Sequence, residues 1–94
     1  MAVNVNLIGA FRTISGRNKI VIKIEGTMSL KEVVKKTVEK VPALTRALID
    51  PELEDPRPNA LILVNGKEIS VLNGLETLVK DGDEIVLVPI IHGG

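Results

Sequence analysis

The sequence predicts an α+β domain in which one main helix covers one face of a mixed sheet of four or five strands. Two early segments alternate apolar with polar residues, as half-buried strands do. The apolar period then changes to about 3.6 residues, and strand-like segments return after residue 59. The resulting order is strand, strand, helix, strand, strand and a last strand, which fits one layer of sheet and one of helix.

A chain of 94 residues supports a single hydrophobic core. The core material is aliphatic, with 12 Val, 11 Ile and 11 Leu, and Phe11 is the only aromatic residue. With 45% hydrophobic residues and zero formal net charge, the chain can bury enough apolar surface to offset its ordering entropy. We expect one domain over residues 1–89 and a flexible tail over residues 90–94.

The first two strands are predicted from alternation. Residues 3–8 read VNVNLI, and residues 19–25 read KIVIKIE with Ile20, Ile22 and Ile24 facing inward. The turn-forming residues SGRN lie between the two segments. Together they predict an opening β-hairpin.

The main helix is predicted from the residues after this hairpin. Its apolar face comprises Leu30, Val33, Val34, Thr37, Val38 and Val41. Ser29 and Glu32 have the spacing of a capping box at its start, and Pro42 disfavours helical geometry at Val41 and ends it. A short second helical turn over residues 43–49 and an exposed loop over residues 50–59 follow, the loop marked by three prolines and four acids.

The remaining strands lie in the second half of the chain. Residues 60–64, ALILV, lack alternation and predict a strand that is buried on both faces or central in its sheet. The dipeptide Asn65-Gly66 predicts a type I′ hairpin turn into residues 67–72. Residues 84–89, EIVLVP, form the last strand, with Pro89 ending its backbone pairing. This order fits the β-grasp, or ubiquitin-like roll, whereas a ferredoxin-like domain would need a second long helix.

Composition excludes several classes of function. Zero net charge and a single aromatic residue argue against nucleic-acid binding. No apolar stretch approaches the roughly 18 residues needed to span a membrane, and no signal peptide is recognisable, so we expect a cytoplasmic protein. With no cysteine and with His92 as the only histidine, we expect neither a bound metal or cofactor nor an enzyme active site.

Charged residues and glycines give only weak signals of a site. The acids at 52–55 and 81–84 are interpreted as solvated turns, and the glycines form no phosphate-binding motif. A basic stripe on the helix comprises Lys31, Lys35, Lys36 and Lys40. The glutamates between these lysines favour a solvated face, and the alternative is an acidic protein partner.

The segment VPIIHGG, residues 88–94, is either a frayed end or an arm whose terminal carboxylate does the work. An extended chain from Pro89 to Gly94 reaches on the order of 20 Å, far enough to enter a partner's active site. Glycine suits the last two positions because it lacks a Cβ and permits close approach. Since a free carboxylate is a poor electrophile, chemistry on it must begin with activation, for which we expect a partner enzyme that uses ATP.

Three segments carry a family resemblance. DGDEIVLVPIIHGG, residues 81–94, resembles the C-terminal motif of the molybdopterin synthase small subunit and of its ubiquitin-like sulfur-carrier relatives, which include small archaeal modifier proteins. Residues 63–83 resemble the V-N-G hairpin and leucine-rich approach of the same family. FRTISG, residues 11–16, is similar to the family's first hairpin loop.

This resemblance implies a β-grasp fold and a carrier or modifier protein rather than an enzyme. It implies that a ubiquitin-activating-type enzyme adenylates the carboxylate of Gly94, which then becomes a thiocarboxylate for sulfur transfer in molybdopterin synthesis or tRNA thiolation, or joins a lysine of a target protein. A large molybdopterin synthase subunit is a further expected partner. The partner-binding residues are expected to be Pro89, Ile90, Ile91, His92 and Gly93.

Two alternatives stay open at this level. His92 either contacts the partner or serves as a spacer, and the spacer is favoured because a residue in a flexible segment rarely has its pKa tuned. The chain as a whole is alternatively a non-covalent β-grasp binding module that uses a sheet face or edge and has an inert tail.

Overall fold

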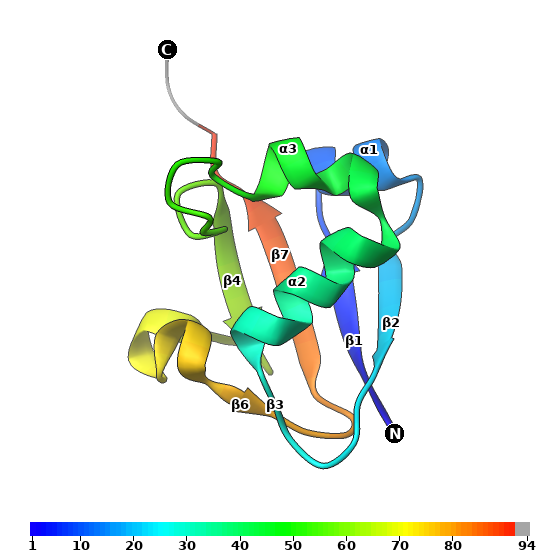
Figure 1. Ribbon diagram of the computed structural model, residues 1–94, viewed down its shortest axis with the longest axis vertical. Helices are drawn as coiled ribbons and strands as arrows, with labels where there is room; N and C mark the ends of the chain where they lie inside the picture. The colour runs from blue at the N-terminus through cyan, green and yellow to red at the C-terminus, as the bar shows by residue number, and fades with distance from the viewer. Residues whose placement is uncertain (92–94) are drawn as a thin grey trace.

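The computed structural model describes residues 1–91 and contains the predicted strands and main helix in the predicted order, with further short elements between them (Figure 1). The strands are β1 (Ala2–Leu7), β2 (Lys19–Lys23), β3 (Met28–Ser29), β4 (Ala60–Val64), β5 (Lys67–Glu68), β6 (Leu78–Val79) and β7 (Glu84–Pro89). The α-helices are α1 (Ala10–Ser15), α2 (Leu30–Lys40) and α3 (Thr45–Leu48), and the 3₁₀ turns are η1 (Pro42–Leu44), η2 (Ile69–Val71) and η3 (Gly74–Glu76).

Five strands form one mixed sheet in the order β2-β1-β7-β4-β5. The strands β1 and β7 run parallel, and the other neighbouring pairs are antiparallel. The helix α2 lies across one face of this sheet (Figure 1). The predicted α+β class and β-grasp architecture are therefore confirmed.

The core lies between α2 and the sheet. The buried face of α2 comprises Leu30, Val33, Val34 and Thr37. Ile85 and Leu87 of β7 and Val3, Val5 and Leu7 of β1 meet it from the sheet side and are almost fully buried. At the predicted cap, the Glu32 N–H donates to Ser29 Oγ at 3.2 Å, and the helix ends at Lys40, just before Pro42.

The opening hairpin differs from its prediction because a helix stands in its connection. The helix α1 spans only Ala10–Ser15, too short a segment for its apolar period to be recognised in the sequence. It begins after Gly9 and ends at Gly16, whose φ of 71° is the left-handed conformation of a helix C-cap. Its Phe11 is buried and explains why the helix folds onto the core.

Of the two alternatives for β4, the position inside the sheet is confirmed, because β4 pairs with β7 and β5, and burial on both faces is wrong. Its residues alternate between buried and more exposed, and Leu61 is 39% exposed. Within residues 1–91 no element covers the face of the sheet opposite α2, so the apolar run ALILV reflects an apolar open face and not a second layer. The sequence cannot distinguish these two causes of a continuous apolar run.

Two short strands also depart from expectation. After the Asn65-Gly66 turn, where both residues have positive φ as predicted, β5 pairs over only two residues and the chain enters the 3₁₀ turn η2. The strands β3 and β6 form a separate two-stranded sheet below α2 that the sequence analysis did not anticipate. Within residues 1–91 no helix is both long and apolar enough to cross a membrane.

Candidate functional site at the C-terminal arm

The strand β7 delivers the chain to the candidate site from the centre of the sheet. It pairs with β1 on one side and with β4 on the other, so its backbone is hydrogen-bonded along both edges. Just past β1, the Ile8 N–H donates to Leu87 O at 3.1 Å. Hydrogen bonds therefore hold the last residues of β7 in place before the arm begins. Figure 1 shows the chain leaving the sheet beside α3 and the loop 50–59.

We define residues 87–90 as the arm root. Backbone pairing does not stop at Pro89 as predicted, because Pro89 lies opposite Ala60 and the Ile90 N–H donates to Asn59 O at 3.0 Å. Proline removes one donor from the ladder, but the next residue restores pairing. Ile90 is 40% exposed, whereas Ile91 is 91% exposed.

Asn59 connects the arm root to the rest of the fold. Its N–H donates to Pro56 O at 3.0 Å, and its side-chain Nδ2 lies 3.4 Å from Leu48 O at the end of α3. The carbonyl that receives the Ile90 N–H is therefore held by the loop 50–59 and by α3. This gives the proline-rich loop a structural task that its sequence did not reveal.

Gly9 supports the arm root from the β1 side. Its backbone has φ 56° and ψ −128°, a combination that side-chain-bearing residues rarely adopt. A Cβ placed on Gly9 would lie 3.6 Å from Cγ of Pro89, so the proline ring packs over this glycine. The pair sets where the chain turns away from the sheet.

The open face of the sheet is apolar next to the arm root. Val86 lies opposite Leu63, and Val88 lies opposite Leu61, in the antiparallel pairing of β7 with β4. Ile90 continues the same alternation past the end of β7. At the beginning of β7 the face becomes polar, because Glu84 accepts hydrogen bonds from the side chains of Asn4 and Asn6.

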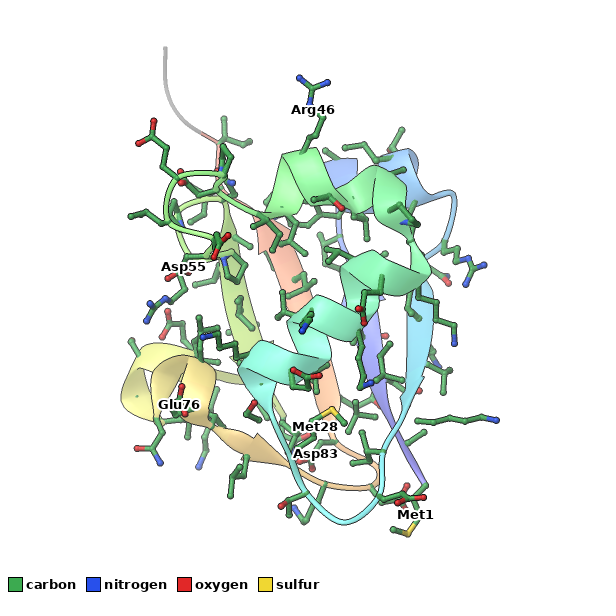
Figure 2. The ribbon with its side chains drawn as sticks, in the orientation of Figure 1. Met1, Met28, Arg46, Asp55, Glu76 and Asp83 are labelled. Atoms are coloured by element: carbon green, nitrogen blue, oxygen red, sulfur yellow. The ribbon has the colours of Figure 1, made fainter. Side chains whose placement is uncertain are left out.

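Charged side chains stand near the arm root without forming a catalytic group. The Arg57 guanidinium hydrogen-bonds Asp55 and lowers the pKa of that carboxyl group. In Figure 2, Asp55 belongs to the loop at this end of the molecule, and Arg46 of α3 extends into solvent. Arg57 also lines a small hollow of about 160 Å³ beside Ile90.

Asp83 lies at the opposite end of β7, where the predicted turn is present but Asp83 itself is buried and not solvated. It is 7% exposed and accepts hydrogen bonds from the Lys80 N–H at 2.8 Å and from Asn65 Nδ2 at 3.0 Å. Burial alone would raise the pKa of Asp83, but these hydrogen bonds and the Lys80 charge together lower it. The neighbouring Gly82 has the positive φ expected of a turn.

Among the described residues, no carboxyl group has a pKa that is shifted upward. The carboxyl groups whose pKa is shifted are Asp55, Glu68, Asp83 and Glu84, and each pKa is lowered. A general acid at neutral pH needs the opposite shift. Among residues 1–91, no cluster of three His, Cys, Asp or Glu side chains could hold a metal ion.

The structure places only part of the predicted site. Pro89 is in β7, and Ile90 and Ile91 mark the end of backbone pairing and the start of full exposure. His92, Gly93 and Gly94 lie outside the described residues, so their predicted roles stay predictions. Sequence reasoning missed Gly9 and Asn59, and the only available signals were a lone glycine after a strand and an asparagine after a proline.

A family model and two relatives found by sequence comparison agree on the family of this chain. The model of the ThiS family matches residues 5–94. Small archaeal modifier protein 3 of Haloferax volcanii is 26% identical over 94 residues, covering 100% of both chains. A protein of Archaeoglobus fulgidus that is named as a sulfur carrier is 36% identical over 67 residues, which are 64% of this chain and 76% of that protein.

A solved structure agrees with these sequence relatives. The solution structure of small archaeal modifier protein 1 from Methanosarcina acetivorans superimposes with a TM-score of 0.84 at 32% identity. The similarity covers 99% of this chain and 96% of that one. The fold therefore occurs in a protein that is similar to this chain along nearly its whole length.

Proposed function

This chain belongs to the ThiS family, and on that premise we propose that it is a ubiquitin-like sulfur carrier and protein modifier whose working group is the Gly94 carboxylate. The family consists of small carrier and modifier proteins, which agrees with the prediction that the chain is not itself an enzyme. The observation that supports the proposal best is the structure of the arm root. The central strand β7 is paired on both sides, and the chain becomes fully exposed between Ile90 and Ile91.

The proposed chemistry begins with adenylation by a partner enzyme. A carboxylate oxygen of Gly94 attacks the α-phosphorus of ATP, and pyrophosphate leaves. A sulfide donor then displaces AMP and leaves a thiocarboxylate, or the amine of a lysine displaces AMP and leaves an amide with loss of one proton. Each acceptor attacks the same acyl-adenylate, so this chain contributes the same arm in both reactions.

The position of the arm root sets the largest distance that can separate the sheet from the partner's active site. Only four residues follow Ile90, and an extended chain of four residues spans about 13 Å, less than the 20 Å expected when the arm began at Pro89. The adenylating enzyme must therefore bind against the molecule itself and not merely capture a distant tail. We assign this contact to the apolar open face formed by Leu61, Leu63, Val86 and Val88.

Intact-mass analysis of the protein from its native cells tests the proposal. We expect a fraction of molecules in which one oxygen is replaced by sulfur, or target proteins that carry the chain on lysine. Trypsin cuts after Lys80, the last basic residue, so the remnant on a modified lysine is the whole segment 81–94. Failure to find either species in cells that contain the adenylating enzyme would contradict the proposal.

Deletion of Gly93 and Gly94 distinguishes the carrier from the alternative binding module. A carrier loses thiocarboxylate formation and conjugation completely, whereas a module with an inert tail retains its partner. Leu78→Ala is the matched control, because Leu78 is 65% exposed in β6, which lies away from the end of the sheet where the arm leaves (Figure 1). The control should be activated at the normal rate.

We also propose which molecules accept the sulfur or the chain. A large molybdopterin synthase subunit would receive sulfur from the Gly94 thiocarboxylate, and lysine-bearing proteins would receive the chain itself. We propose that both occur in the cytoplasm, where the adenylating enzyme finds ATP. Purified thiocarboxylated chain mixed with the large subunit tests sulfur transfer, which would regenerate the Gly94 carboxylate. The unmodified chain mixed with the adenylating enzyme, ATP and a lysine-bearing protein tests conjugation.

A further inference from the structure

The strand β2 is the one long free edge of the main sheet within residues 1–91. The Leu7 N–H donates to Asn18 O, and the Ile24 N–H donates to Met1 O. Because hydrogen-bonded pairs alternate in an antiparallel ladder, Ile20 and Ile22 also face β1. The backbone N–H and C=O groups of Lys19, Val21 and Lys23 therefore point away from the sheet.

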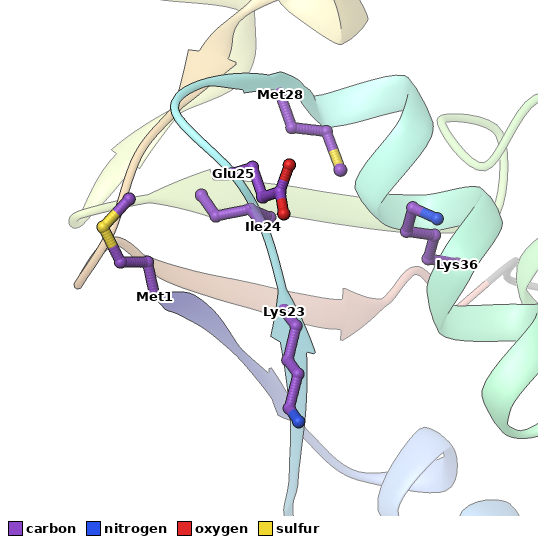
Figure 3. Close-up of a pocket in the computed structure, with 6 residues that line it drawn as sticks. All are labelled: Met1, Lys23, Ile24, Glu25, Met28 and Lys36. Carbon is purple, nitrogen blue, oxygen red and sulfur yellow. The ribbon is translucent and has the colours of Figure 1, made fainter.

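Two surface hollows continue this edge toward α2. One, of about 370 Å³, is lined by Val21, Ile22, Lys23, Lys36, Glu39 and Lys40. The other, of about 500 Å³, is lined by Met1, Lys23, Ile24, Glu25, Met28 and Lys36 (Figure 3). Since Lys23 and Lys36 line both, the two hollows form one trough along the strand, which we call the edge trough.

The edge trough combines apolar lining with positive charge. Val21 is 43% exposed, and the methionines Met1 and Met28 present flexible apolar side chains at the far end of the trough. The ammonium groups of Lys19, Lys23, Lys36 and Lys40 border the edge, against the carboxylates of Glu25 and Glu39. The chain as a whole has no net charge, so the positive excess is local.

Lys40 already contacts this edge. Its Nζ donates to Val21 O at 2.9 Å, although the side chain is exposed and the bond is therefore easily exchanged. Lysines along an edge strand oppose pairing with a second copy of the same strand, because like charges would face each other. A strand that brings carboxylates would instead pair with these ammonium groups.

We propose that the edge trough binds an extended segment of a partner protein in which apolar and acidic residues alternate, and that this segment pairs with β2 as an additional strand of the sheet. Backbone bonds to Val21 and its neighbours supply the pairing. The trough lies where β1 and β7 begin, since Lys23 pairs with Ala2, whereas the arm leaves where β7 ends. Both partners can therefore bind at once, and the proposal does not depend on the chemistry of Gly94.

The structure divides the basic stripe that the sequence left undecided. Lys36 and Lys40 line the edge trough, whereas Lys31 and Lys35 line a different hollow between α2, α3 and the loop 50–59. Lys35 and Lys36 are adjacent and carry the same charge. They therefore form a matched pair for a test.

The test titrates isotope-labelled full-length chain with a blocked ten-residue peptide in which valine and aspartate alternate. We expect amide shift changes centred on Lys19, Val21 and Lys23, and slower hydrogen exchange at Val21. Lys36→Glu should weaken binding about tenfold and Lys35→Glu less than twofold. Deletion of Gly93 and Gly94 should leave the affinity unchanged, which separates this proposal from the one about the arm.

A second probe and a second variant complete the test. A peptide that alternates valine and lysine should bind at least about tenfold more weakly. Val21→Pro removes one outward N–H on an edge where proline is tolerated, so it should abolish pairing while the remaining amide spectrum keeps its dispersion. Equal weakening by Lys35→Glu and Lys36→Glu, equal binding of both peptides, or no binding at millimolar peptide would each overturn the proposal.

Discussion

The central strand β7 and the edge strand β2 belong to one sheet but offer opposite surfaces to other molecules. The backbone of β7 is paired along both edges, so only its end at Ile90 is available. The backbone of β2 is paired along one edge, so its whole side is available and its end is not. In the two proposals above, the end of β7 leads to the group that reacts, and the free side of β2 is available for pairing with another strand.

This difference follows from strand order and not from composition. Both strands are aliphatic and alternate buried with exposed residues. Their positions differ because α2 crosses from the first hairpin to the second, which leaves β1 and β7 parallel in the middle of the sheet. Substitutions in β7 should therefore act through packing, and substitutions on the exposed side of β2 should not.

The largest expected effect is the loss of packing at Leu87. Leu87→Ala should lower the free energy of unfolding by about 3 kcal/mol, because Leu87 is fully buried between α2 and the sheet. Val21→Ala on β2 should change it by less than about 0.5 kcal/mol, since Val21 is 43% exposed. Urea unfolding measures both. Equal losses would show that the edge is packed as tightly as the centre.

The next effect concerns the support of the arm root. Gly9→Ala should cost about 2 kcal/mol, because alanine is strained at φ 56° and ψ −128°, while its Cβ would contact the Pro89 ring at an ordinary 3.6 Å. Gly16→Ala is the control, with a left-handed φ but open space around it, and should cost about 1 kcal/mol. Hydrogen exchange at the Ile90 N–H should accelerate in Gly9→Ala beyond the change in global stability, and an unaltered Ile90 rate would separate Gly9 from the arm root.

The third effect is the contribution of Asp83, at the beginning of β7, to the pH dependence of the free energy of unfolding. Its pKa is lowered in the folded protein, so its stabilisation is present above the unfolded pKa of about 4 and is lost as pH falls through the lower folded value. At neutral pH, Asp83→Asn should lower the free energy of unfolding by about 1.5 kcal/mol, and the gap to the natural protein should close as the pH falls through the lowered folded pKa of Asp83. Glu52→Gln in the distant loop is the control, and a gap that persists in acid would contradict this role of Asp83.

The pattern of residues was sufficient for the helix α2, the turn at Asn65-Gly66 and the strand β7. Each depends on local chemistry, namely a capping box with a following proline, a dipeptide suited to positive φ, and alternation between two faces. The short helix α1 and the β3–β6 pair could not be predicted. They exist because of tertiary contacts, such as burial of Phe11 and pairing of Met28 with Val79.

The sequence predicted only those residues of the candidate site that are neighbours in the chain. Residues 89–94 are contiguous, so family resemblance identified them together. Asn59 and Gly9 support the arm root from places 31 and 80 residues before Ile90 and Pro89 in the chain, and nothing in their local sequence connects them to it. Strand order brings them together, as it also exposes the edge of β2.

The smallest expected effect locates the boundary between sheet and arm. Ile90→Ala should cost about 1 kcal/mol, because the Ile90 side chain is more than half buried, while the backbone bond from its N–H to Asn59 O is kept. Ile91→Ala should cost less than about 0.5 kcal/mol, since Ile91 is 91% exposed. Adenylation rates should show the reverse order of importance if the enzyme grips the arm beyond its root. A stability cost at Ile91 equal to that at Ile90 would move the boundary outward and shorten the arm available to the enzyme.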